Sequence, residues 1–409
     1  MNCNHSLKPP GALLTLPTRR LTLIGILGLV AFVSACSSVT SPVIRTSYSI
    51  PQDAISQWMI EYRTGEDKVQ LTLRYDRHNE SNTGRHSESH STSFRIAPDQ
   101  LRGLTREQAM SSGTHVQFQF KRDAGTFNCD GWFKEGNGSG HFTFSANPGF
   151  AAELKTQGYG EPTYEQQFSM AMNDTSLAFI KELQDQGYDK PALEELVQLG
   201  NHGVRLEYVQ GLKSLGYSLK STDLLRRMKD HGVNLNFIQD LSALGYQRLS
   251  PEELIKTRDH GVNPNFVRDM AALGYDHLTL EELVRAKDHG VRAEDVNEFA
   301  AAGYAKPSLD ELIALRDHGV NAKFVQELQT LGYAHLSIDQ LRDMRDHGVN
   351  AQFIQELKAL GYDRVPLEQL IRLRDHGVSA AYIQRMKTRG YEGQSLDDFV
   401  HMRDRGVKE

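Results

Sequence analysis

Cysteine is scarce in this 409-residue sequence, which contains only three. Cys3 and Cys36 lie within the first 36 residues, so the rest of the chain keeps only Cys129 and cannot form an internal disulfide. The sequence also lacks a basic excess, because 46 Lys and Arg residues against 52 Asp and Glu residues give a net charge of −6. Nucleic-acid binding needs basic surface to neutralise phosphates, so the composition argues against a nucleic-acid partner.

The first 35 residues have the pattern of a bacterial export signal. Lys8, Arg19 and Arg20 precede an apolar run, Leu21–Val33, and no acidic residue occurs among them. The run has 13 residues and is too short to span a bilayer comfortably. We therefore predict a signal peptide over residues 1–35.

Residues 33–36, Val-Ser-Ala-Cys, resemble the bacterial lipobox. The resemblance implies that the thiol of Cys36 receives a diacylglycerol and that three acyl chains hold the mature protein to a membrane. An ordinary secretory signal and an uncleaved anchor are the alternatives. Ser37, where Asp would imply inner-membrane retention, favours the outer membrane facing the periplasm. Residues 36–51 are rich in Ser, Thr and Pro and are predicted to be a tether.

Apolar residues recur with period two over residues 52–150, as in Trp58 and Ile60, or Phe118 and Phe120. This pattern is typical of half-buried strands, and short turn sequences between the runs favour antiparallel hairpins. We expect about six strands in an antiparallel sheet or small sandwich. Thr105 and Gln108 form a capping-box sequence for one short helix.

Two features of this β-rich module could carry chemistry. His78, His86 and His90 flank a polar segment that we interpret as a solvated loop, with a metal-binding hairpin tip as the alternative. Cys129 alternates with Phe127 and Phe133 and is predicted to face the core, although a reactive thiol would need an electropositive, exposed setting.

Residues 151–409 repeat every 29 residues. A His-Gly-Val marker and a Gly-Tyr marker both keep this step without an insertion. The first copy is degenerate because Asn-Asp-Thr at 173–175 replaces His-Gly-Val, and the chain ends on a half unit. The marker histidines are His202, His231, His260, His289, His318, His347 and His376.

Each unit is predicted to contain two short helices. Ser308 with Glu311 forms a capping box that starts the first helix, and Gly319 ends it in the left-handed conformation. Asn321 caps the second helix, which ends at Gly332. Leu recurs at the position of Leu312, and Val or Ile at the position of Val325, so these stripes should form a continuous core. The fold class is therefore a β-rich module followed by an α-solenoid of two-helix units.

The row of marker histidines has three interpretations. We favour helix termination, because His318 precedes the terminating Gly319 and suits the negative end of the helix dipole. Surface contact with a ligand and metal binding are the alternatives. Neighbouring helices pack roughly 8 to 10 Å apart, whereas two imidazoles sharing a zinc ion each need a nitrogen about 2 Å from the ion.

Catalytic motifs are missing from the sequence. Neither H-E-x-x-H nor G-x-S-x-G occurs, and the glycine-rich residues 136–140 lack the lysine of a phosphate-binding loop and favour a turn. We therefore predict no catalytic residue, no metal site and no cofactor.

The repeat resembles helical repeats with an L-R-x-H-G-V core and an L-G-Y end, found after a β-rich segment in some bacterial membrane metallopeptidase regulators of the β-lactam-sensor type. Residues 316–320 (Arg-Asp-His-Gly-Val) and 331–333 (Leu-Gly-Tyr) carry this likeness, which covers roughly residues 110–409. The peptidase zinc motif is absent from the sequence, so the resemblance implies only an accessory or interaction role.

We expect a non-catalytic, lipid-anchored envelope protein that binds another protein or a cell-wall component. A periplasmic sensing ectodomain of an envelope-stress system and an unrecognised hydrolase are the alternatives.

Overall fold

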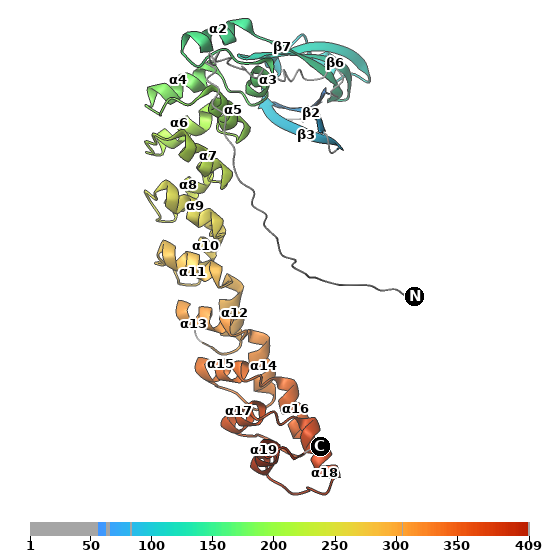
Figure 1. The fold of residues 1–409 in the computed structure, drawn as a ribbon, viewed down its shortest axis with the longest axis vertical. Coiled ribbons are helices and arrows are strands. Elements are labelled where there is room, and N and C mark those ends of the chain that lie inside the picture. The colour runs from blue at the N-terminus through green and yellow to red at the C-terminus, as the bar shows by residue number, and fades with distance from the viewer. Residues whose placement is uncertain (1–55, 63–65, 82–83, 305, 408–409) are drawn as a thin grey trace, which may run out of the picture. The chain divides into compact units, whose positions relative to one another are not determined.

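A computed structural model describes residues 56–62, 66–81, 84–304 and 306–407 of the chain. They form an antiparallel sheet followed by consecutive helices, which confirms the predicted fold class (Figure 1). The predicted signal peptide, Cys36 and the tether lie outside the described residues. Among the residues that are described, no helix has the length and hydrophobicity needed to cross a bilayer.

The β-rich module is a single sheet and not a sandwich. Within the described residues it has seven strands, one more than the alternation predicted, because the two-residue strand β4 is too short to show a period. The spatial order is β3-β2-β1-β7-β6-β5-β4, and every neighbouring pair is antiparallel. The strands are β1 (Ser56–Glu61), β2 (Val69–Ser81), β3 (Gly84–Ile96), β4 (Leu101–Arg102), β5 (Thr114–Arg122), β6 (Gly125–Lys134) and β7 (Asn137–Ala146).

One face of the sheet holds an aromatic core built around Trp58. The indole is fully buried, and its Nε1 donates a hydrogen bond to the backbone oxygen of Asp130 at 3.1 Å. Gly131 and Gly140 lie beneath the ring, where a Cβ on either residue would approach the indole to 2.6 or 2.8 Å. Cys129 is buried in the same core, as predicted, and burial raises the pKa of its thiol.

Apart from residues 82–83, the polar segment between His78 and His90 belongs to strands β2 and β3 and is not a loop. Strands β2 and β3 continue through it, pairing from Val69 with Ile96 to Ser81 with Gly84. The prediction was wrong because the backbone ladder of a hairpin continues without apolar side chains, which were the only signal used. The predicted glycine-rich turn is confirmed at its start, since Glu135 and Gly136 have positive φ angles, but β7 begins at Asn137.

The link between β3 and β5 contains the expected short helix. A 3-10 turn, η1 (Pro98–Gln100), leads into β4, and α1 (Arg106–Ala109) follows. Thr105 and Gln108 make the reciprocal capping contacts predicted for them.

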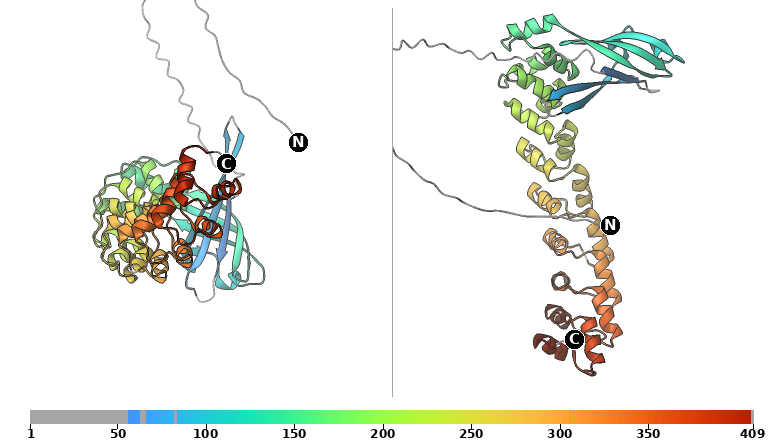
Figure 2. Two further views of the ribbon diagram at one scale, coloured as in Figure 1. Left: turned by 90° about the horizontal axis from the view of Figure 1, so that it is seen from below. Right: turned by 45° about the vertical axis from the view of Figure 1, so that its right-hand side comes forward.

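The described helices of the solenoid are nine residues long and alternate between two rows (Figure 2). The first helices of the units are α3 (Tyr164–Met172), α5 (Leu193–Asn201), α7 (Thr222–Asp230), α9 (Pro251–Asp259), α11 (Leu280–Asp288), α13 (Leu309–Asp317), α15 (Ile338–Asp346), α17 (Leu367–Asp375) and α19 (Leu396–Asp404). The second helices are α2 (Pro148–Thr156), α4 (Leu177–Asp185), α6 (Leu206–Ser214), α8 (Leu235–Ala243), α10 (Pro264–Ala272), α12 (Ala293–Ala301), α14 (Ala322–Thr330), α16 (Ala351–Ala359) and α18 (Ala380–Thr388).

Helix boundaries follow the sequence signals. Ser308 and Glu311 form the predicted capping box of α13, and the Asn321 side chain accepts a hydrogen bond from the Phe324 amide at the start of α14. Gly319 has a φ angle of +67°, the left-handed conformation expected of a helix-terminating glycine. First helices pack on first helices and second on second, with Leu312 and Val325 buried between them.

The array begins one helix earlier than the His-Gly-Val marker indicates. Helix α2 starts at Pro148 and is a lone second helix, followed by Gly158-Tyr159, which lies 29 residues before Gly187-Tyr188. The degenerate copy still has both of its helices, α3 and α4. The extra Gly-Tyr marker was present in the sequence and could have revealed this half unit.

We expect Gly319→Val to destabilise the solenoid by about 1 to 3 kcal/mol, because valine cannot adopt a φ of +67° without strain. Gln326→Ala, on the exposed face of α14, should change the stability by about 0.5 kcal/mol or less. Denaturant midpoints measure both effects, and hydrogen exchange should rise first near residues 290–350. Equal midpoints would contradict the proposed helix termination.

Candidate interaction surfaces

The marker histidines connect neighbouring units. Each lies at the C-cap of a first helix, as predicted, and its Nδ1 hydrogen-bonds the carboxylate of the Asp that ends the next first helix. The Nδ1 to Oδ1 distances are 2.5 to 2.7 Å. The seven pairs are His202–Asp230, His231–Asp259, His260–Asp288, His289–Asp317, His318–Asp346, His347–Asp375 and His376–Asp404. We call this set the His–Asp ladder.

The first unit continues the ladder without charge. Asn173 occupies the histidine position, Asn201 occupies the aspartate position, and the two amides hydrogen-bond at 2.7 Å. At the other end Arg405 takes the place of the next histidine. The imidazoles of the ladder are about one third exposed, for example 35% for His318. Partly exposed hydrogen bonds of this kind contribute about 1 kcal/mol or less each to stability.

The carboxylate of Asp375 raises the pKa of His347, mainly through their hydrogen bond. We expect NMR titration to place the His347 pKa above about 6.5. Because the folded-state pKa is raised, the pair's contribution to stability is complete below that pH and is lost as the pH rises through the raised value. Asp375→Asn should return the titration toward the ordinary value, whereas Asp363→Asn, beside Lys358, should leave it unchanged. An unchanged titration in Asp375→Asn would contradict the pairing.

In the part of the chain that the structure describes, no group of three His, Cys, Asp or Glu side chains is placed to hold a metal ion. His90 is exposed and stacks on Tyr75, with 5.0 Å between ring centroids. The side chains of His78 and His86 lie outside the described residues, and their backbones pair with Ser87 and Asn79 rather than with each other.

The tyrosines of the Gly-Tyr marker form a second set of contacts between units. In six of them the hydroxyl donates to a backbone carbonyl 32 residues further along the chain, as Tyr246 does to Leu278 at 2.7 Å. The other pairs are Tyr217 with Leu249, Tyr275 with Pro307, Tyr304 with Leu336, Tyr333 with Val365 and Tyr362 with Gln394. These contacts fix the spacing of the second row of helices.

Cations from one unit also lie over aromatic rings of the preceding unit. Arg258 lies 4.9 Å from the centroid of the Phe237 ring, and Arg345 lies 4.7 Å from that of Phe324. In α12 the aromatic position is taken by Asp295, whose side chain is 5% exposed and is 3.7 Å from Arg316. Arg316 therefore contacts a carboxylate where the equivalent cations of other units contact an aromatic ring, and the contact between the two units is kept.

A partly buried ion pair joins the sheet to the first unit. The Arg122 guanidinium at the end of β5 lies 2.9 Å from the carboxylate of Asp174 and over the rings of Phe94 and Phe120. Asp174 occupies the position of the helix-terminating glycine and keeps a left-handed φ of +56°. Desolvation is the main cause of a raised Asp174 pKa and a lowered Arg122 pKa. The Asn-Asp-Thr sequence that replaces His-Gly-Val in this copy therefore supplies the carboxylate that contacts the sheet.

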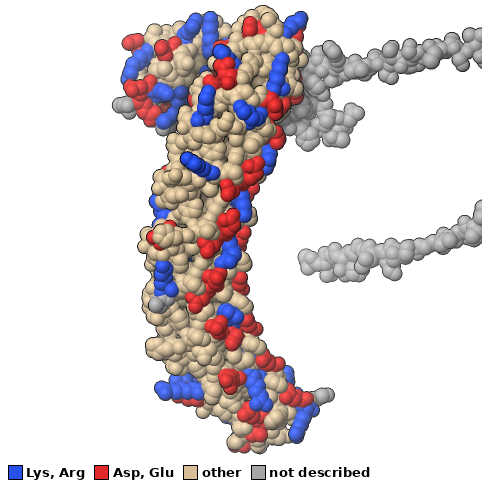
Figure 3. Space-filling model, turned by 90° about the vertical axis from the view of Figure 1, so that its left-hand side faces the viewer, with Lys and Arg blue, Asp and Glu red and all other residues tan. Residues whose placement is uncertain are grey.

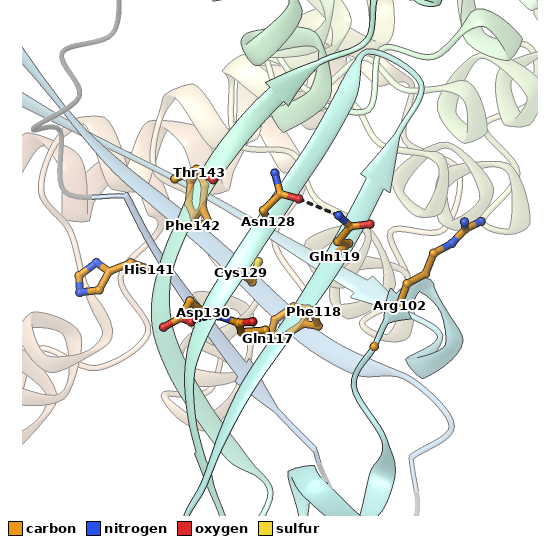
Figure 4. A pocket seen from close by; sticks show the side chains of 11 residues that line it. Arg102, Gln117, Phe118, Gln119, Asn128, Cys129, Asp130, His141, Phe142 and Thr143 are labelled. Atoms are coloured by element: carbon orange, nitrogen blue, oxygen red, sulfur yellow. Dashed lines mark hydrogen bonds between the residues drawn. The ribbon is translucent and has the colours of Figure 1, made fainter.

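The outward face of the sheet carries polar side chains and one exposed tryptophan. Gln117 donates to Asp130 at 2.7 Å, and Gln119 donates to Asn128 at 2.8 Å. These residues border an open hollow over β5, β6 and β7 (Figure 4). The ring of Trp132, 61% exposed, lies beside them on β6. We call this surface the outer face.

The outer face was not predicted from the sequence. Phe127, Cys129 and Phe133 set the inward phase of β6, and Trp132 lies in the opposite, outward phase. A tryptophan in the polar phase of an alternating strand was the signal that could have found it.

No known family model matches this chain, and no curated protein matches it. The resemblance to repeats of metallopeptidase regulators therefore stays a prediction. The fold and surfaces define a repeat protein, an α-solenoid preceded by a curled antiparallel sheet.

Proposed function

We propose that this chain is a lipid-anchored envelope protein that acts as a non-catalytic interaction scaffold for another protein or a cell-wall component. The observation that carries this proposal is the periodic solenoid, in which the same inter-unit contacts recur with a strict 29-residue step. Such arrays typically bind partners along their extended surfaces.

The charge distribution of the solenoid supports a protein or wall partner. Acidic and basic side chains gather in a band along one side of the stacked helices, beside a broad area with few charges (Figure 3). Mixed charge in a narrow band favours specific recognition over general attraction to a polyanion.

The scaffold proposal is tested by photo-crosslinking in intact envelopes. A photoreactive side chain replaces Gln326 or Gln355, which are equivalent exposed positions in two units. We expect both positions to capture the same partner, while the same substitution at exposed Asp99 of η1 serves as the control and should not capture it. Absence of any adduct from both solenoid positions would contradict a scaffold role for this surface.

The anchoring part of the proposal depends on Cys36. Cys36→Ala should abolish lipidation and move the protein from the membrane fraction to the soluble fraction, since the acyl chains supply the attachment. Cys3→Ala, in the same leader, is the matched control and should leave the protein in the membrane pellet. Retention of Cys36→Ala after a carbonate wash would overturn the lipid anchor.

A further inference from the structure

The strand register arranges the outer face in rows. Met59, Ser139, Trp132 and His115 lie opposite one another across β1, β7, β6 and β5. The next row contains Gln57, His141, Asp130 and Gln117, and the row beyond it contains Thr143, Asn128 and Gln119. The strands are about 4.8 Å apart, so the rows form a continuous surface of side chains.

The polar groups in these rows are held in place by one another. Gln117 and His115 both contact the carboxylate of Asp130, at 2.7 and 3.2 Å, and these hydrogen bonds, with Gln117 first, lower its pKa. Asn128 accepts from Gln119 and donates to Ser145 at 3.0 Å. Planar amides and a carboxylate fixed in this way present paired acceptors and donors without the entropic cost of ordering them on binding.

The exposed aromatic ring of Trp132 lies next to these polar groups. The imidazole of His115 packs edge-on against the Trp132 ring, with 5.1 Å between centroids, and fixes the indole while leaving it 61% exposed. Met59, 50% exposed, lies in the same row beyond Ser139. The exposed indole therefore lies directly beside the ordered polar groups of the outer face.

The charge of the outer face limits the class of ligand that this surface can attract. Asp130 is the one carboxylate in the three rows, and the cations that continue these rows onto the neighbouring strands are Arg74 on β2 and Arg102 on β4. A surface with nearly balanced charge offers little attraction to a nucleic acid or a strongly charged peptide. A neutral polyol, by contrast, needs a flat apolar ring for its C–H face and fixed hydrogen-bonding groups for its hydroxyls.

We propose that the outer face binds a neutral glycan strand, with Trp132 stacking on a pyranose ring and Gln117, Asp130 and Asn128 binding hydroxyl or acetamido groups. This inference rests on the proposed function and names the cell-wall ligand as polysaccharide. The sheet binds the wall while the solenoid is free to bind a protein.

The first test uses the two tryptophans of the full-length protein in detergent. Trp58 is fully buried, so acrylamide quenches mainly Trp132. A β-1,4-linked hexamer of N-acetylglucosamine should protect Trp132 from quenching, and Gln117→Ala should raise the concentration needed by about tenfold. Unchanged quenching at saturating hexamer would overturn the proposal.

The second test is co-sedimentation with purified peptidoglycan sacculi stripped of protein. We expect Trp132→Ala to reduce the bound fraction at least fivefold, while Tyr391→Ala, which removes an exposed aromatic ring near the end of the solenoid, leaves it unchanged. Equal sedimentation of Trp132→Ala and wild type would overturn the proposal. Loss of binding when the sacculi are treated with protease would also overturn it, because the ligand would then be a residual protein. If the protein fails to bind sacculi while a photoreactive side chain at position 326 still captures a partner protein in envelopes, the glycan inference fails and the scaffold proposal stands.

Discussion

Arg122→Met should weaken the attachment of the sheet to the solenoid by about 2 to 3 kcal/mol, somewhat less than the roughly 3 to 5 kcal/mol seen when one partner of a fully buried ion pair is removed. Asp174 would keep its charge in a half-buried site, where its side chain is 34% exposed, after losing the guanidinium 2.9 Å away. Urea unfolding followed by Trp58 fluorescence measures the loss. Lys181→Met, which removes an exposed ion pair with Asp185, is the control and should cost about 0.5 kcal/mol or less.

A second variant separates the ion pair from the packing of the long arginine side chain. Arg122→Met combined with Asp174→Asn removes the stranded charge and keeps a side chain of the same shape, which tolerates the left-handed φ of +56°. We expect the double variant to be more stable than Arg122→Met alone. If it is less stable, the stranded charge is not the cause of the destabilisation.

Gly140→Val is expected to unfold the β-sheet, with a cost of at least about 3 kcal/mol. A Cβ at this position would lie 2.1 Å from the backbone oxygen of Asp130 and 2.8 Å from Nε1 of Trp58, and neither the paired strand nor the fully buried ring can move away. Ser139→Val introduces the same side chain one residue earlier on the exposed face and should cost less than about 0.5 kcal/mol.

The two parts of the molecule should respond differently to Gly140→Val. Trp58 fluorescence should lose its buried character, while helical circular dichroism at 222 nm should largely persist, because each helical unit depends mainly on its neighbours. Loss of both signals in one transition would show that the sheet and the solenoid unfold as one cooperative unit.

The sequence predicted the helices well because their limits are set locally. A capping box needs only Ser308 and Glu311, and a left-handed stop needs only Gly319, so both could be recognised without knowing any neighbour in space. The 29-residue period then fixed the order of the units and the buried positions of Leu312 and Val325.

Contacts between units were beyond sequence reasoning. His318 has Asp317 next to it in the chain, yet it binds Asp346 of the next unit, because the stacking of first helices decides which carboxylate comes within 2.6 Å. The sequence contained both residues but not the relative rotation of their helices. The same applies to Arg122 and Asp174, which meet only where the sheet packs on the first unit.

The β-rich module was less predictable for a related reason. Alternation located the core around Trp58, but hairpin β2–β3 extends into a segment whose sequence contains no apolar residue, so alternation could not follow it. The outer face was missed because Gln117, Asp130 and Trp132 become one surface only through the pairing of β5 with β6.

The direction of the His–Asp ladder has a consequence for the length of the molecule. Every internal unit offers a histidine to the unit that follows and an aspartate to the unit before it, so the ladder contact is the same at each internal joint. Each internal unit therefore carries the same two contact residues, a histidine for one neighbour and an aspartate for the other. Removing one set of 29 residues would rejoin, for example, His289 to Asp346 in place of Asp317, so the reach of the protein can change in whole steps while its joints stay the same.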